Sequence, residues 1–139
     1  MIRDAVAGDA GVLARVLGDW VRDTEWMPKL HSREEDLGFL QGLIAACRVR
    51  ILGEGAGFMA VEGGVVRALY LEPAARGLGL GKALLDEAKG RAGRLELYTF
   101  EANAGARRFY AREGFREVRF GAENEEGLPD VFLVWQRGS

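Results

Sequence analysis

A glycine-rich segment at residues 76–82 carries the clearest chemical signal in this chain. Its letters, Arg-Gly-Leu-Gly-Leu-Gly-Lys, follow an apolar run at residues 65–71 and lead into a helix-like stretch at residues 82–91. Glycines let backbone N–H groups approach a phosphate closely, and the first turn of a helix leaves such groups without intrahelical partners. A strand, a turn and a helix N-terminus in this order predict a phosphate-binding loop.

Two familiar phosphate-binding loops do not fit these letters. A Walker A loop needs four residues between its first glycine and the Gly-Lys pair, whereas three separate Gly77 from Gly81. It also needs Ser or Thr after the lysine, where this chain has Ala83. A dinucleotide-binding fingerprint needs a third glycine where Lys82 or Leu84 stands, depending on the glycine from which it is counted. Both loops are therefore excluded.

A second segment with chemical content follows at residues 103–115, with the letters Asn-Ala-Gly-Ala-Arg-Arg-Phe-Tyr-Ala-Arg-Glu-Gly-Phe. Asn103 and Tyr110 lie seven positions apart, which is close to two turns of a helix. Their side chains are therefore predicted to share one face of a helix over residues 103–113, where both can face one ligand.

Together the two segments resemble the GNAT superfamily of N-acyltransferases. Arg76, Gly79 and Gly81 match its Gln/Arg-x-x-Gly-x-Gly/Ala motif, and the later segment matches Asn-x-x-Ala-x-x-x-Tyr-x-x-x-Gly-Phe. The resemblance extends over essentially the whole chain. It implies an enzyme that transfers an acetyl group from acetyl-CoA to a primary amine of a small molecule, peptide or protein, by direct transfer in a ternary complex.

The resemblance also implies where acetyl-CoA binds. In the family the acyl-CoA lies where two parallel strands splay apart, here the strands expected at residues 65–71 and 95–100. The backbone of Leu69, Tyr70 and Leu71 would hold the pantetheine, and an N–H there would polarise the thioester carbonyl. The residues implied in phosphate binding are Arg76, Gly77, Leu78, Gly79, Leu80, Gly81 and Lys82.

Two side chains receive roles from the same resemblance. Asn103 would hydrogen-bond CoA, and Tyr110 would bind the cofactor and protonate the departing thiolate. A phenol suits this task because its reference pKa of about 10 is not far above the value of about 8.5 for a thiol. The alternative interpretation of Tyr110 is a core aromatic beside Phe109.

The base that deprotonates the acceptor amine is left open. Some relatives place a glutamate five residues ahead of the helix asparagine, where this chain has Tyr98. Water-relayed deprotonation is an equal alternative. Cys47, the single cysteine, falls outside the transferase segments, so no thiol is expected to carry the acetyl group. The side chains left as candidate bases are Glu62, Glu72, Glu96, Glu101 and His31.

Two segments are expected to frame the acceptor. Residues 20–31, between the first two helices, are rich in aromatic residues, and residues 121–130 carry three glutamates and one aspartate. We hypothesise that Trp26, Glu126 and Asp130 contact a cationic amine, because acidic groups attract cations. The alternatives are a hydrophobic lid over the core and an acidic solvated turn.

Hydrophobic periodicity and turn residues predict the elements that position these groups. The expected order is β-α-α-β-β-β-α-β-α-β-β, an α/β fold with a central mixed sheet flanked by helices. Ser32 to Glu35 reads as a capping box ahead of the second helix. Glycine-containing breaks at residues 53–55 and 62–64 predict hairpins. We expect one GNAT domain over residues 1–139.

Composition excludes several classes of protein. The 19 basic and 21 acidic residues are mixed along the chain, so we expect no nucleic-acid partner. No apolar run approaches the ~20 residues that span a bilayer, and no signal peptide is evident, so we expect a cytoplasmic protein without a membrane partner. One cysteine and one histidine leave no metal-ligand motif, and no metal is expected.

Three functions fit these features of the sequence. Beside the enzyme stand a non-catalytic acyl-CoA-binding or sensing module of the same fold and a partner-interaction domain that uses the tryptophan-rich segment. Relatives are often dimers, so a homodimer is also expected, although the sequence leaves the oligomeric state and the acceptor open.

Overall fold

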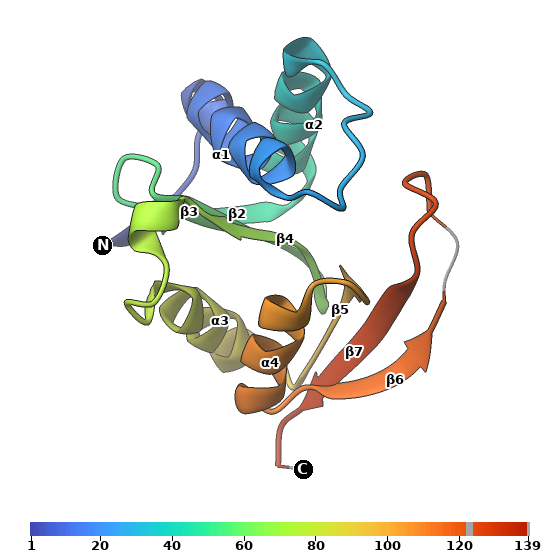
Figure 1. The fold of residues 1–139 in the computed structure, drawn as a ribbon. Helices are drawn as coiled ribbons and strands as arrows, with labels where there is room; N and C mark the ends of the chain where they lie inside the picture. The colour runs from blue at the N-terminus through green and yellow to red at the C-terminus, as the bar shows by residue number, and fades with distance from the viewer. Residues whose placement is uncertain (122–123, 139) are drawn as a thin grey trace.

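Seven strands form one mixed sheet that is covered by helices on both faces in the computed structural model, which describes residues 1–121 and 124–138 (Figure 1). The strand order in the sheet is β1-β2-β3-β4-β5-β7-β6. The strands are β1 (Ile2–Asp4), β2 (Arg48–Leu52), β3 (Gly57–Glu62), β4 (Val65–Leu71), β5 (Arg94–Phe100), β6 (Arg116–Phe120) and β7 (Asp130–Gln136). The helices are α1 (Ala10–Asp23), α2 (Arg33–Ala46), α3 (Leu80–Arg91) and α4 (Ala104–Arg112), with short 3₁₀ turns η1 (Ala7–Asp9) and η2 (Pro73–Ala75).

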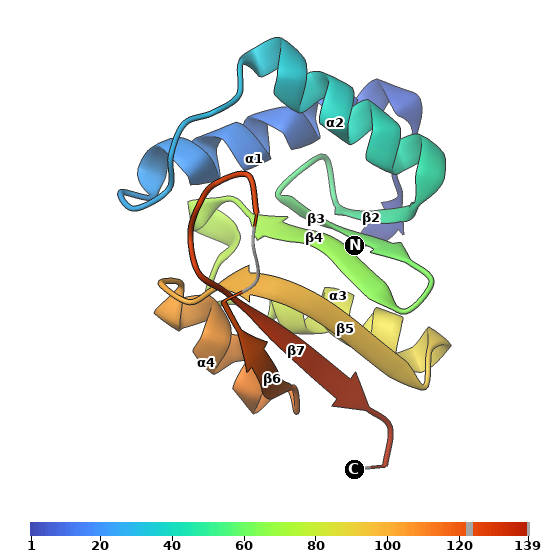
Figure 2. The same ribbon diagram turned by 90° about the vertical axis from the view of Figure 1, so that its right-hand side faces the viewer.

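Each face of the sheet has its own hydrophobic cluster. Helices α1 and α2 cover β2 to β4 on one face, and α3 and α4 lie on the other (Figures 1 and 2). The first cluster includes Leu13, Leu40, Val49, Ile51 and Phe58. The second includes Leu84, Leu85, Leu95, Tyr110, Val131 and Leu133. The apolar residues that alternate along the strands are thus divided between two helix layers.

The predicted order of elements is confirmed, with small shifts at the ends. The second helix begins at the expected capping box, in which Ser32 Oγ accepts from the Glu35 N–H at 3.1 Å and Glu35 Oε1 accepts from the Ser32 N–H at 2.9 Å. Helix α3 begins two residues earlier than predicted, at Leu80. Helix α4 begins one residue later, because Asn103 is its N-cap.

Strands β4 and β5 are neighbours that scarcely pair. Among the described residues they pair in parallel at Val65↔Glu96, and no pairing follows toward the other end of β4. The register of β4 with β3 moves from Ala60↔Ala68 to Val61↔Val66, so Arg67 is an extra residue in β4. Such a bulge bends the strand that carries it. The two strands therefore diverge toward the glycine-rich segment, as the sequence predicts.

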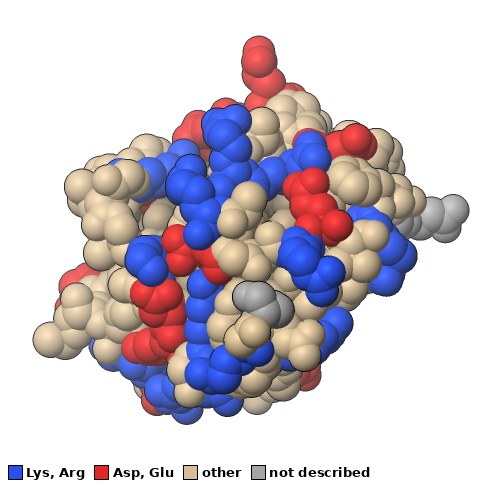
Figure 3. Space-filling model, turned by 90° about the horizontal axis from the view of Figure 1, so that it is seen from below, with Lys and Arg blue, Asp and Glu red and all other residues tan. Residues whose placement is uncertain are grey.

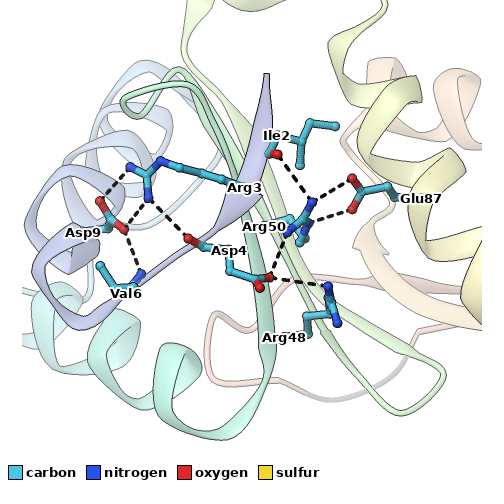
Figure 4. A network of polar contacts seen from close by, with 8 residues as sticks. All are labelled: Ile2, Arg3, Asp4, Val6, Asp9, Arg48, Arg50 and Glu87. Atoms are coloured by element: carbon cyan, nitrogen blue, oxygen red, sulfur yellow. Dashed lines mark hydrogen bonds and ion pairs between the residues drawn. The ribbon is translucent and has the colours of Figure 1, made fainter.

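An ionic network at the β1 edge ties α3 to the sheet (Figure 4). Arg50 on β2 donates to both carboxylate oxygens of Glu87 on α3, at 2.8 and 3.1 Å, and to Asp4 on β1 at 2.9 Å. The Arg50 side chain is only 15% exposed. Because one guanidinium joins three elements, this network fixes where α3 lies on the sheet.

The surface below α3 and α4 carries acidic and basic side chains next to one another (Figure 3). None of the helices in the described part of the chain is long and apolar enough to cross a membrane.

Candidate active site

The loop after β4 needs glycine at two positions. Gly77 and Gly79 have φ values of 75° and 78°, in the left-handed region that other residues seldom adopt. Apart from the adjoining residues of the loop, no atom of the described residues lies within 4 Å of the place where either glycine would carry a Cβ, so the loop is open above its backbone. Arg76 Nε donates to the Leu71 carbonyl at 3.1 Å and joins the loop to the end of β4.

Helix α3 starts directly from this loop. Gly79 is its N-cap, and the Ala83 N–H donates to the Gly79 carbonyl at 3.0 Å. The N–H groups of residues 80–82 precede that bond and point out of the first turn, at the positive end of the helix dipole. The Lys82 side chain is directed along the surface, where its Nζ lies 3.1 Å from Asp86 and 3.5 Å from Glu113. Its contribution to an anion site here is therefore its backbone N–H.

Gly81 has a different role from the other two glycines of the motif. It is buried, and a Cβ there would lie 3.4 Å from the ring of Phe109 on α4 and 3.6 Å from Leu71. The small residue thus lets α3 approach the end of β4 and α4 closely.

The end of β4 offers backbone groups toward the gap. Leu69, Tyr70 and Leu71 pair with β3 on one side. On the other side, toward β5, the described residues provide no strand partner. Hydrogen-bonding groups on that edge can therefore receive an extended ligand in the manner of an added strand.

Asn103 lies at the start of α4 rather than within it. Its side-chain Oδ1 accepts from the Ala106 N–H at 3.1 Å, which makes it the N-cap. This capping role was not predicted, although asparagine is among the residues preferred at the N-cap.

Tyr110 on α4 is buried, with 7% of its surface exposed. Its ring lies 5.2 Å from that of Phe109 and 5.4 Å from that of Phe115. Burial raises the pKa of Tyr110, and the nearby Tyr70 phenol raises it further. The Tyr110 phenol therefore carries its proton at neutral pH and can act as a proton donor.

A chain of aromatic rings spans the gap between β4 and β5. The ring of Tyr70 on β4 lies 5.2 Å from Trp20 on α1, which lies 6.0 Å from Trp26 in the α1–α2 connection. Trp26 in turn lies 5.6 Å from Phe100 at the end of β5. All four residues are half-buried. Of these side chains, only Trp26 was assigned to the acceptor site from the sequence. The contacts among the four rings could not be predicted, because they join four separate segments.

The β6–β7 loop reaches the α1–α2 connection (Figure 2). His31 Nε2 lies 2.7 Å from Glu125 Oε1. The next residue, Glu126, is half-buried, and side-chain atoms of the three residues lie within 4.8 Å of one another. Burial, with a contribution from the Glu126 charge, raises the pKa of Tyr70 to about 12. Glu126 therefore lies close to the exposed histidine, and its charge reaches the Tyr70 phenol.

Asp130 is buried at the base of the same loop, with 8% of its surface exposed. Asn124 Nδ2 donates to Asp130 at 3.2 Å and to the Leu128 carbonyl at 2.7 Å, so this carboxylate helps to shape the loop. Glu123, one of the three glutamates expected here, lies outside the described residues.

The other candidate bases are spread around the sheet. Glu62 and Glu96 lie at the end of the sheet where β4 and β5 still pair, and each lies beside an arginine, at 2.6 Å and 2.5 Å. Glu72 and Glu101 are exposed. Cys47 packs at the edge of the α1–α2 cluster, and burial raises the pKa of its thiol.

A mixed sheet with diverging central strands, a glycine loop leading into a helix N-terminus and a buried tyrosine on the next helix define the acyl-CoA-dependent acyltransferase class of fold. A model of the acetyltransferase (GNAT) domain matches residues 33–117, which is more than half of the chain. The chain belongs to the GNAT acetyltransferase family, and the resemblance stated from its two motifs is confirmed.

A curated relative is the peptidyl-lysine N-acetyltransferase YiaC of Escherichia coli K12. It is 32% identical over 84 residues, which cover 60% of this chain and 58% of YiaC. The match thus spans less than two thirds of the length of that relative.

Solved structures share the fold over nearly the whole chain. YjaB from Escherichia coli has a TM-score of 0.78 at 22% identity, with 97% of this chain and 96% of YjaB covered. A phosphinothricin acetyltransferase from Sinorhizobium meliloti, solved in complex with AcCoA, has a TM-score of 0.75 at 20% identity, with 98% of this chain and 87% of that one covered. At these identities the likeness establishes the fold.

Proposed function

We propose that this chain is an acetyl-CoA-dependent N-acetyltransferase that acts on a primary amine. The observation that carries the proposal is the divergence of β4 and β5 beyond Val65↔Glu96, with a glycine loop and a helix N-terminus at the open end. The complex of the Sinorhizobium neighbour with AcCoA supports the choice of cofactor.

The described residues fit the cofactor. Left-handed Gly77 and Gly79, with no protein atom over them, leave room for a diphosphate beside the first N–H groups of α3. The backbone of residues 69–71 would hold the pantetheine arm. When bound, acetyl-CoA supplies the activated acetyl thioester, and an N–H of β4 would stabilise negative charge on its carbonyl oxygen.

Tyr110 would then give its proton to the departing sulfur. A phenol carries its proton at neutral pH, and burial raises the pKa of this one further. Asn103 would contribute its amide to CoA while its Oδ1 caps α4. Cys47 packs against the α1–α2 cluster, and burial raises the pKa of its thiol. The acetyl group would therefore pass directly to the amine.

The acceptor would enter between the aromatic chain and the β6–β7 loop. Trp26 would supply apolar contact, Glu126 would supply negative charge, and Asp130 would hold the loop in shape and add to the negative field. YiaC is by its name a peptidyl-lysine N-acetyltransferase, which supports a lysine-like amine, free or in a protein, as the acceptor.

A panel of primary amines and lysine peptides tests the proposal. The purified chain, mixed with acetyl-CoA and each acceptor, is expected to release free thiol and to form the acetylated amine, detected by mass spectrometry. Tight binding of acetyl-CoA with no turnover across the panel would instead favour a sensing module.

A further inference from the structure

The acceptor amine must lose a proton, and the structure narrows the choice of the group that receives it. This inference rests on the proposed function. A base has to lie within reach of the amine, directly or through one water. Glu62 and Glu96 lie where β4 and β5 are still paired, at the end of the sheet opposite the glycine loop, and each is held by an arginine.

The two remaining candidate glutamates are also poorly placed to receive the proton of the amine. Glu72 is exposed, immediately before η2. Glu101 is exposed as well, and its charge acts on Arg107, which lies on the outer side of α4 beside Glu117. Both carboxylates therefore face solvent, and no contact in the described residues directs either of them toward the aromatic residues.

Glu126 differs from all four in its surroundings. It is half-buried on the β6–β7 loop, it lies close enough to Tyr70 for its charge to act on that phenol, and it lies within 4.8 Å of His31 and Glu125. The contact of Glu125 with His31 at 2.7 Å anchors the loop, so that Glu126 is held near Tyr70. Tyr70 and Glu126 are half-buried, and His31 is exposed.

We propose that Glu126 accepts the proton of the acceptor amine and that His31 passes it on to solvent. Glu126 would be a catalytic residue, since it would contact the amine. His31 is 41% exposed and would act through Glu126 as the exit for the proton. Tyr70 would remain a neutral phenol that can hydrogen-bond the amine but not deprotonate it.

The proton balance of this step closes. The amine nitrogen forms its bond to the carbonyl carbon as the bond from that carbon to sulfur breaks. An alkylammonium gives up two protons in total. One leaves through Glu126 and His31, and the other replaces the proton that Tyr110 gives to sulfur. The products are the amide, the CoA thiol and one proton in solvent.

Acidic side chains surround His31 and raise its pKa. Glu125 faces its Nε2, and Glu35 on α2 lies 3.7 Å from its Nδ1. Hydrogen bonding to Glu125, with smaller contributions from Glu125 and Glu35 as charges, raises the pKa of His31 above 6.5. The His31 charge also acts on Asp36 on α2, whose pKa is raised by burial. The raised pKa of His31 favours the form of the imidazole that carries an extra proton.

Glu126→Gln tests the proposal against two matched controls, Glu125→Gln and Glu101→Gln. The acceptor is an alkylamine found active in the amine panel, compared with its analogue made less basic by fluorine on the neighbouring carbon. For the alkylamine we expect Glu126→Gln to lower kcat/KM about 10²-fold or more. For the less basic amine, of which a larger share is already neutral, we expect a smaller loss, of less than about tenfold. The KM for acetyl-CoA should not change.

The pH profile provides a readout that a structural role would not move. With Glu126→Gln, activity on the alkylamine should keep rising with pH, because only the solvent can then remove the proton. With Glu125→Gln, the profile should shift to lower pH, because His31 loses the partner that raises its pKa. Glu101→Gln should match the wild type.

Two results would overturn the proposal. A Glu126→Gln variant that matches Glu101→Gln in rate and pH profile, in an active enzyme, would refute the role of Glu126 alone. Loss of wild-type activity in EDTA would show that His31, Glu125 and Glu126 hold a cation instead of moving a proton. A wild type that acetylates no amine would contradict the proposed function itself.

Discussion

At the scale of single residues, the site depends on side chains whose chemistry is set by their surroundings. Tyr110 is buried between Phe109 and Phe115, and this burial keeps its phenol protonated. Tyr98 carries the same side chain but is 52% exposed. Two identical side chains thus differ in burial, and it is the place of Tyr110 in the fold that makes it the candidate proton donor.

Tyr110→Phe isolates the proposed proton donor. The ring and its packing stay, so we expect the melting temperature to change little while kcat falls about 10²-fold, the size of a lost general acid. The KM for acetyl-CoA should be unchanged, and Tyr98→Phe should behave as the wild type. If Tyr110→Phe had the wild-type kcat at every pH, the role assigned to Tyr110 would be wrong.

At the scale of elements, the position of α3 decides where the phosphate-binding N–H groups lie. Gly81 lets the start of the helix approach Phe109, and the Arg50–Glu87 pair holds its second half against β2. The hydrogen bond from Arg50 lowers the pKa of the Glu87 carboxyl below its usual value of 4.5. A carboxyl with a lowered pKa in the folded protein stabilises the fold above that usual value.

Glu87→Gln should therefore lower the free energy of unfolding at neutral pH, by about 1–2 kcal/mol, because Arg50 keeps Asp4 but loses a charged partner. The difference from wild type should shrink as the pH falls below 4.5, where the wild-type carboxyl is progressively protonated. Urea unfolding at several pH values measures this. Glu62→Gln, which breaks the exposed pair with Arg67, should have little effect. An equal loss in both variants, or a loss independent of pH, would contradict the account.

At the scale of the whole molecule, the sequence predicted the features that are set by residues close together in the chain. Helices, hairpins and the glycine loop followed from local periodicity, capping and turn residues, and their order is confirmed. The predictions on single site residues, on one domain and on a homodimer remain predictions.

Contacts between segments that are far apart in the chain could not be predicted from local sequence patterns. The contact of His31 with Glu125 joins residues 94 positions apart, and the Trp20–Trp26 pair reaches both Tyr70 and Phe100 only once the sheet has formed. Burial of Asp130 likewise follows from the loop that Asn124 closes around it. These arrangements depend on tertiary packing, for which sequence spacing carries no signal.

Isothermal titration calorimetry with acetyl-CoA tests the central claim most directly, that backbone N–H groups after Arg76 hold its diphosphate. Wild-type protein should bind, and Gly79→Ala should bind about tenfold or more weakly, because a left-handed alanine costs about 1–2 kcal/mol. Gly90→Ala, an exposed change within the same helix, should bind as the wild type does. No binding by the wild type at concentrations up to about 1 mM, or equal binding by Gly79→Ala, would contradict the account.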